Sequence, residues 1–157
     1  MKIFISGGSG FVGGAAIRHL SQHHAIAAMA RSEKSADIVT SLGAQAIHCS
    51  LDTVAAEHLA DCDIVIHAAA KVEAWGQWSD FERLNIEGTQ RMLDAARAAG
   101  VRRFIHIGTE AALFHGQPMR EIDESYPLAP DSPFPYSASK AQAEQRVRAA
   151  NNPADMT

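Results

Sequence analysis

The chain is poor in the features that mark metal-binding and membrane proteins. Its 157 residues include only two cysteines, Cys49 and Cys62, which lack the close spacing of metal ligands. We therefore expect no metal site, and a reducing cytoplasm as the location. No stretch reaches the roughly 18 consecutive apolar residues of a membrane span, so we expect no membrane partner.

Positive charge is also scarce. The formal net charge is −4 and the chain has no basic run, which argues against nucleic acid as a partner. Hydrophobic residues make up 46% of the chain and charged residues 20%, which is ordinary for a soluble globular protein. The length predicts one domain that is large enough for a real core.

The most informative segment is rich in glycine and lies near the N-terminus. An apolar run, Ile3-Phe4-Ile5, leads into Ser6-Gly7-Gly8-Ser9-Gly10-Phe11-Val12-Gly13, and a helical pattern follows. This strand–turn–helix layout is typical of a site for a dinucleotide pyrophosphate, because glycine allows a sharp turn and a close approach of backbone to phosphate. The motif reads in two frames, with either Gly8 or Gly7 ahead of Gly10 and Gly13. The alternative is a glycine-rich turn without a ligand.

The rest of the chain alternates between strand and helix patterns. We predict strands at 2–6, 25–30, 44–48, 63–67 and 102–108, and helices at 11–23, 35–42, 54–60, 79–99 and 136–150. Strands that are apolar throughout suit a parallel sheet covered on both faces. The pattern therefore predicts an α/β fold, a Rossmann-type doubly wound parallel sheet with helices on both faces.

A second informative segment is Tyr136-Ser137-Ala138-Ser139-Lys140. Residues four apart on a helix share a face, so we expect Tyr136 and Lys140 to point into the same space. The pKa of a free tyrosine is about 10, and a nearby ammonium would lower it toward the range useful for proton transfer. The alternative is an ordinary exposed helix turn.

An ordered set of motifs carries a family resemblance. Besides the glycine-rich segment and Tyr136–Lys140, the set comprises Asp52, His67-Ala68-Ala69-Ala70, Asn85-Ile86-Glu87-Gly88-Thr89 and Gly108-Thr109-Glu110-Ala111. With these motifs the chain resembles the extended short-chain dehydrogenases/reductases, and more narrowly their NAD-dependent epimerase/dehydratase and 3β-hydroxysteroid dehydrogenase-like branch. Glu110 beside Thr109, in place of a more usual serine pair, favours the steroid-dehydrogenase-like side.

The resemblance implies a role for each motif. Thr109 would hydrogen-bond the substrate oxygen, Tyr136 would act as general acid/base, and Lys140 would hold the nicotinamide ribose and lower the pKa of Tyr136. Asn85 belongs to a motif beside the cofactor and is expected to brace the structure. The other implied cofactor contacts are Gly7, Ser9, Gly10, Phe11, Val12 and Gly13 at the pyrophosphate, Leu51 and Asp52 at the adenine, and Ala68, Ala69 and Ala70 along the cofactor.

The end of the second predicted strand bears on the choice of cofactor. NAD binders usually place Asp or Glu there, whereas this strand ends Ala28-Met29-Ala30-Arg31-Ser32. Arg31 and Ser32 are suited to a 2′-phosphate, so we favour NADP over NAD. The alternative is that Arg31 stacks on the adenine and tolerates either cofactor.

The implied function is that of an NAD(P)-dependent oxidoreductase, interconverting a secondary alcohol and a ketone on a small-molecule substrate. Two alternatives are a nucleotide-sugar epimerase or dehydratase with tightly bound NAD, and a non-catalytic dinucleotide sensor. Family members are longer, so residues 1–157 resemble the dinucleotide-binding domain, with the C-terminal substrate-binding part absent. Many relatives dimerise through two long helices, which predicts a homodimer through helices 79–99 and 136–150.

Several other side chains are candidates for the neighbourhood of the site. Trp75, Trp78 and Phe81 follow the fourth predicted strand, at the sheet edge where ligands bind in open α/β folds. They are candidates for the wall of an apolar substrate pocket, or alternatively loop aromatics that pack on the next helix. His67 and His106 end strands, and we expect them to be packed or hydrogen-bonded near the site rather than bound to a metal.

Overall fold

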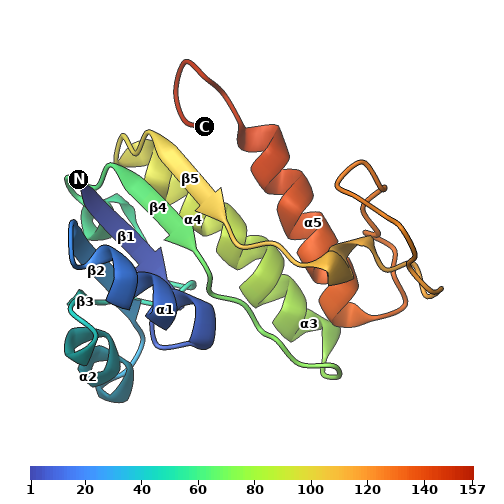
Figure 1. Ribbon diagram of the computed structural model, residues 1–157, viewed down its shortest axis with the longest axis horizontal. Helices are drawn as coiled ribbons and strands as arrows, with labels where there is room; N and C mark the ends of the chain where they lie inside the picture. The colour runs from blue at the N-terminus through green and yellow to red at the C-terminus, as the bar shows by residue number, and fades with distance from the viewer.

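Five short parallel strands form the single sheet at the centre of the molecule (Figure 1). The computed structural model describes residues 1–157. The strands are β1 (Lys2–Ser6), β2 (Ala25–Ala30), β3 (Gln45–His48), β4 (Ile64–His67) and β5 (Arg103–His106), in the order β3-β2-β1-β4-β5. The strand order reverses between β1 and β4, which confirms the predicted doubly wound sheet and creates the switch point where such folds bind ligands.

Helices cover both faces of this sheet. The longer ones are α1 (Phe11–Leu20), α2 (Glu33–Ser41), α4 (Gly88–Ala98) and α5 (Pro135–Ala150). Short elements are the 3₁₀ helices η1 (Ala56–Leu59) and η3 (Glu110–Leu113), one α-helical turn, α3 (Trp78–Phe81), and the π-helical η2 (Glu82–Glu87). None of the helices combines the length and apolar character needed to cross a membrane.

The side chains of β1 alternate between two buried clusters, as the period of a strand requires. Phe4 belongs to the cluster on the α4 side, which also contains Met92. Ile3 and Ile5 belong to the cluster on the α1 and α2 side, together with Ile17 of α1. Both faces of the central strand are therefore buried, which explains its uninterrupted apolar sequence.

The helix predicted at 79–99 lies where the sequence places it, but it is not one continuous α-helix. The structure replaces it with α3, the π-helical η2 and α4. Inside η2, Asn85 is buried, and its backbone carbonyl accepts a hydrogen bond of 2.6 Å from the Thr89 hydroxyl. At the other end, Gly100 has a φ of +74°, the left-handed conformation expected of a glycine that follows a helix.

Other boundaries differ from the predicted ones by a few residues. Helix α1 ends at Leu20 rather than at residue 23, and the helix predicted at 54–60 is the 3₁₀ turn η1. Strand β5 ends at His106, two residues before the predicted end. Past α5, the N–H of Thr157 donates to the Arg102 carbonyl at 3.1 Å, and the Phe104 N–H donates to the Thr157 carbonyl at 2.8 Å. This is the pattern of parallel pairing along the outer edge of β5.

Candidate functional site

The glycine-rich turn after β1 packs too tightly for larger residues. Gly7 has a φ of +73°, and a Cβ atom there would lie 2.7 Å from the Ala68 carbonyl carbon. A Cβ atom on Gly13 would overlap the Gly7 carbonyl oxygen. Gly8 instead faces the core, where a Cβ atom would lie 2.8 Å from Ile17 Cδ1. Of the two sequence frames, the one that contains Gly7, Gly10 and Gly13 therefore forms the turn itself.

The same turn presents the first N–H groups of α1 to solvent. Gly10 is the N-cap of α1, has no side chain that could accept these hydrogen bonds, and is followed by no acidic residue in the first turn. Phe11 is 93% exposed and Val12 48% exposed, so the end of the helix is open. Unpaired N–H groups at a helix N-terminus, together with its dipole, favour an anionic group such as a pyrophosphate. The arrangement fits the predicted dinucleotide.

A buried chain of hydrogen bonds starts directly below this turn. The Ser6 hydroxyl lies 2.7 Å from His67 Nδ1, and His67 Nε2 lies 3.0 Å from the Thr89 hydroxyl. The Thr89 hydroxyl donates its single proton to the Asn85 carbonyl oxygen, which can only accept a hydrogen bond. Thr89 must therefore accept from His67, so the neutral His67 ring carries its proton on Nε2 and accepts from Ser6 through Nδ1.

Asn85 ties the loop after β4 to α5. Its amide oxygen accepts from the Lys71 N–H at 2.7 Å, and its amide nitrogen donates to the Lys71 carbonyl at 3.1 Å and to the Ser139 hydroxyl at 2.9 Å. Ser139 in turn donates to the Tyr136 carbonyl at 2.9 Å. Both N–H groups of the Asn85 amide are thus engaged within the protein, which supports the bracing role and not a direct cofactor contact.

Thr109 and Tyr136 meet at the carboxyl end of β5. Thr109 caps η3, and its hydroxyl donates to the Glu110 carboxylate at 3.1 Å. Burial is the main cause that raises the pKa of the Tyr136 phenol; the neighbouring Thr109 lowers it, and the nearby Glu110 carboxylate raises it. This direction is opposite to the decrease that the sequence predicts for Tyr136, and Lys140 is not among the groups that cause the shift.

Lys140 reaches toward the sheet and not toward Tyr136. It is buried, and its ammonium donates to the Ile107 carbonyl at 2.8 Å and lies 3.2 Å from His106 Nε2. Burial lowers the pKa of Lys140 to about 8, although the Glu144 carboxylate opposes the decrease. Helical spacing correctly places Tyr136 and Lys140 on one side of α5, but it cannot indicate that β5 offers the lysine two nearer partners.

His67 and His106 lie near the site and are not arranged to bind a metal. Their ring centroids are 5.6 Å apart. Burial, followed by the charge of Lys140, lowers the pKa of His106 to about 3, and burial with the two neighbours His106 and Lys140 lowers the pKa of His67 well below its usual value. Both rings are therefore neutral at physiological pH. The structure contains no group of three or more His, Cys, Asp or Glu side chains that could hold a metal ion.

A pocket of approximately 280 Å³ opens at the carboxyl ends of β2 and β3. Arg31 is exposed at its rim, and the Ser32 hydroxyl caps α2 by accepting from the Ser35 N–H at 3.3 Å. Glu33 also faces the pocket and lies 3.9 Å from His48. The residues that line it are Ala30, Arg31, Ser32, Glu33, His48, Cys49, Ser50 and Thr53.

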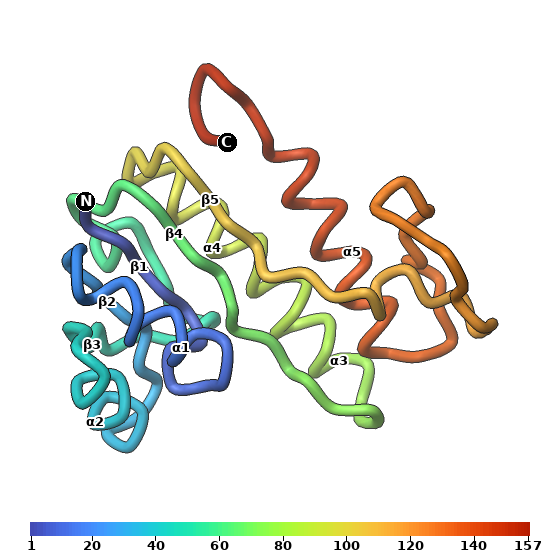
Figure 2. The backbone as a smooth tube through the Cα atoms, in the orientation of Figure 1, coloured from blue at the N-terminus to red at the C-terminus, as the bar shows by residue number.

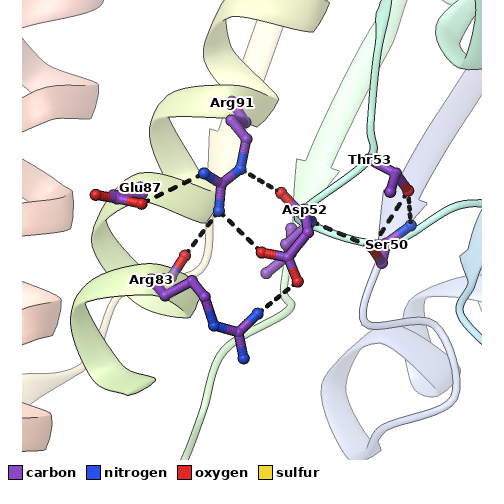
Figure 3. Close-up of polar contacts among 7 residues, drawn as sticks. Ser50, Asp52, Thr53, Arg83, Glu87 and Arg91 are labelled. Carbon is purple, nitrogen blue, oxygen red and sulfur yellow. Dashed lines mark hydrogen bonds and ion pairs between the residues drawn. The ribbon is translucent and has the colours of Figure 1, made fainter. Parts of the chain in front are cut away.

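Two arginines fix the loop that follows β3 (Figure 3). The Asp52 carboxylate pairs with Arg83 and, at 3.2 Å, with Arg91. Arg91 also donates to the Leu51 carbonyl at 2.6 Å and to the Arg83 carbonyl at 2.9 Å. Sequence reasoning assigned Leu51 and Asp52 to the adenine and missed these arginines, although Arg83, Glu87 and Arg91 recur at four-residue spacing. Leu51 is buried in the core, so only its backbone and Asp52 remain available to a ligand.

All of these parts lie at one end of the molecule. In Figures 1 and 2 the segment after β4, η3 and the N-terminal end of α5 gather beyond the carboxyl ends of the strands. Trp75 is 74% exposed and Trp78 40% exposed in this region. Phe81 is fully buried, with the Lys71 ammonium 5.2 Å from its ring centroid, so it packs in the core and cannot line a substrate pocket.

Comparison with known proteins identifies the family. A model of the NAD dependent epimerase/dehydratase family matches residues 3–157. The chain belongs to this family. It is 43% identical over 157 residues to a 4-hydroxy-2-methyl-3-oxo-4-farnesyl-3,4-dihydroquinoline-1-oxide ketoreductase of Stigmatella aurantiaca, covering 98% of this chain and 47% of that protein. It is 31% identical over 152 residues to a decarboxylating sterol-4-alpha-carboxylate 3-dehydrogenase of Dictyostelium discoideum, covering 92% and 46% respectively.

A solved structure has a similar fold over this part of its chain. A short-chain dehydrogenase/reductase superfamily protein from Agrobacterium tumefaciens, crystallised with bound NAD, matches with a TM-score of 0.79 and 28% identity. The match covers 94% of this chain and 44% of that one. This chain thus spans about half the length of the two relatives and of the solved structure that it matches.

Proposed function

We propose that residues 1–157 form the dinucleotide-binding domain of an NAD(P)(H)-dependent oxidoreductase that interconverts a secondary alcohol and a ketone. The observation that carries this proposal is the meeting of Thr109 and Tyr136 beside Lys140, at the same sheet edge as the exposed glycine-rich turn. A glycine turn alone would suit many dinucleotide proteins. A paired hydroxyl and phenol with a buried lysine behind them is suited to proton transfer at a substrate oxygen.

The nicotinamide cofactor, when bound, supplies or accepts the hydride. Its pyrophosphate would lie at the N-terminus of α1, and its adenosine end at the pocket below Arg31. Because burial and Glu110 raise the pKa of Tyr136, the phenol holds its proton at neutral pH. Tyr136 is thus set to donate that proton to a carbonyl oxygen, while Thr109 hydrogen-bonds the same oxygen. The reduction of a ketone is the direction that this protonation state favours.

The substrate that we propose carries a large apolar group. Three large apolar side chains from the segments around the site are exposed, with Val72 69%, Trp75 74% and Phe134 36% exposed. The relatives support the same class, since one is named for a farnesyl-bearing quinoline oxide and the other for a sterol. A nucleotide sugar would instead call for charged partners to a diphosphate, and apolar side chains supply none.

We further propose that NADP is the preferred dinucleotide, with Arg31 on its 2′-phosphate. Arg31 is exposed at the rim of the pocket at the ends of β2 and β3, where a guanidinium suits a phosphate. Calorimetric titration of NADPH and NADH should show tighter NADPH binding. Arg31→Ala should weaken the binding of NADPH and leave the binding of NADH unchanged. Arg18→Ala, an exposed arginine on α1, is the control. Equal affinities would instead agree with Glu33 binding the ribose hydroxyls of NAD.

The test of the activity is Tyr136→Phe in the full-length protein. Loss of a general acid typically slows turnover by about 10² to 10⁴-fold, and binding of the dinucleotide should persist. Ser125→Ala, in the exposed loop ahead of α5, is the control. If Tyr136→Phe left the function of the protein unchanged, a dinucleotide sensor would be favoured. NAD that copurifies and does not exchange would favour the epimerase or dehydratase reaction.

A further inference from the structure

We propose that His106 is a positioning residue for Lys140: its neutral ring, protonated on Nδ1, accepts a hydrogen bond from the Lys140 ammonium through Nε2. The ring lies at the end of β5 and the lysine on the facing side of α5, with 3.2 Å between Nε2 and Nζ. The inference rests on the proposed function only for the role of Lys140 beside Tyr136 and Thr109. No motif that led to the proposed function includes His106.

The direction of this hydrogen bond follows from counting protons. The Lys140 pKa of about 8 leaves the amine mostly protonated at neutral pH, and an ammonium has three donors and no acceptor. One donor goes to the Ile107 carbonyl at 2.8 Å. His106 must therefore accept at Nε2, and the single proton of its neutral ring is left on Nδ1.

The surroundings of Nδ1 give this assignment an energetic cost. That atom is buried and has no hydrogen-bond partner in the protein. Buried polar atoms without partners are rare in native structures, and each calls for an explanation. With Nε2 occupied by the Lys140 ammonium, the proton on Nδ1 has no acceptor, and this unpaired N–H is the energetic cost of the contact. Because Nδ1 has no partner, His106 cannot pass a proton onward, which makes it an anchor for the amine and not a relay.

The two neighbouring rings consequently hold opposite tautomers. His67 carries its proton on Nε2, because Thr89 can only accept from it, whereas His106 carries its proton on Nδ1. The other titratable groups that face Lys140 are Glu144, one turn along α5, and Tyr136, one turn back, with Glu110 beyond it. Neither the Glu144 nor the Glu110 carboxylate is within hydrogen-bond reach of the Lys140 amine. The acceptors that hold the amine are therefore neutral, and Lys140 can turn toward Tyr136 without breaking an ion pair.

The experiment is ¹⁵N NMR of the histidine rings and the lysine amines of this chain. It needs neither cofactor nor substrate, so its failure is distinct from a failure of the proposed function. At about pH 7 we expect a protonated Nδ1 and a bare Nε2 for His106, and the reverse for His67. A proton on Nε2 of His106 at that pH would overturn the proposal without the need for any variant.

Two substitutions test the consequence for Lys140. His106→Phe keeps a ring but offers no lone pair, so the ammonium loses an acceptor and the pKa of Lys140 should fall further. His106→Gln offers an amide oxygen and should return the pKa toward that of the unaltered chain. His23→Phe and His23→Gln, at an exposed position, are the matched controls and should change nothing. A Lys140 pKa that is the same in His106→Phe, His106→Gln and the unaltered chain would exclude the proposed contact.

Discussion

The Nδ1 atom of His67 lies 2.7 Å from the hydroxyl oxygen of Ser6, with both side chains buried between β1 and β4. Ser6 precedes the glycine-rich turn, so this contact joins the turn to β4, the strand that Ala68 and Ala69 follow. The same hydroxyl also accepts from the Ala69 N–H at 3.3 Å. One serine therefore holds the two loops that flank the switch point of the sheet.

Ser6→Ala should lower the free energy of unfolding by about 1–3 kcal/mol, because it leaves His67 Nδ1 and the Ala69 N–H buried without a partner. Urea denaturation of the two chains measures this difference. Ser9→Ala, at an exposed serine in the same turn, should fall within about 0.5 kcal/mol of the unaltered chain. Equal effects of the two substitutions would show that the Ser6–His67 contact contributes nothing.

Gly13→Ala should abolish dinucleotide binding and lower the free energy of unfolding. The added methyl group would overlap the Gly7 carbonyl, and overpacking of this kind costs about 1–3 kcal/mol. Gly14→Ala is the matched control. Its methyl group would lie 3.3 Å from Gly8 O and Leu42 Cδ1, a tight contact but not an overlap. Calorimetric titration and thermal unfolding measure the two properties. Tight binding by Gly13→Ala would contradict the assignment of the turn.

Acid should destabilise the fold through its two buried histidines. Both have a pKa below the unfolded value of about 6.5, so the unfolded chain binds more protons as the pH falls through that value. Each histidine then removes up to about 1.4 kcal/mol of stability per pH unit, and this loss continues for His106 until its folded pKa of about 3. Urea unfolding from neutral to acidic pH should show a steep slope, and His106→Phe should make it shallower. A slope unchanged by that substitution would mean that His106 is protonated in the folded state.

Lys140→Met should stabilise the domain while it removes activity. The decrease of the lysine pKa from 10.5 to about 8 corresponds to about 3 kcal/mol of unfavourable burial, part of which its hydrogen bonds to Ile107 and His106 offset. We expect a net gain of about 1–2 kcal/mol in the free energy of unfolding. Lys34→Met, at an exposed lysine, is the control. A destabilised Lys140→Met variant would show that the amine contributes more to the fold than its burial removes.

Arg91→Met should destabilise the chain more than Arg83→Met. Arg91 donates to two backbone carbonyls and to Asp52, so its loss leaves several acceptors without partners and should cost about 1–3 kcal/mol. Arg83 is 48% exposed and pairs with Asp52 alone through its guanidinium, a contact of at most about 1 kcal/mol. Denaturant unfolding of both variants and of the double variant measures the two contributions. The reverse order would refute this assignment.

The order of the motifs was enough to predict the sheet. The glycine-rich segment after the first apolar run fixes the start of the doubly wound arrangement, and the alternation of patterns supplies the rest. The position of the π-helical turn was not predictable, because the contacts that Asn85 makes from inside it are with Lys71 and Ser139, which are distant in the sequence.

The residues of the site were predictable from the sequence, but the contacts between them were not. Spacing places Tyr136 and Lys140 on one side of a helix, but the partner of Lys140 comes from β5, and no local rule connects position 140 with position 106. The same limit explains why Asp52 was assigned to the adenine without its arginines. Contacts between elements depend on how the elements dock, which a single sequence does not specify.

The π-helical turn between Glu82 and Glu87 makes this region respond unequally to changes of length. A π turn holds about one residue more than an α-helical turn, so deleting one residue there would restore an ordinary helix and leave the helix that follows facing nearly the same way. The residues inside the turn would shift instead, and Asn85 would lose its contacts with Lys71 and Ser139. Deleting a residue between Thr89 and Arg91, in the regular helix α4, would rotate Arg91 by about 100° about the axis and turn it away from Asp52.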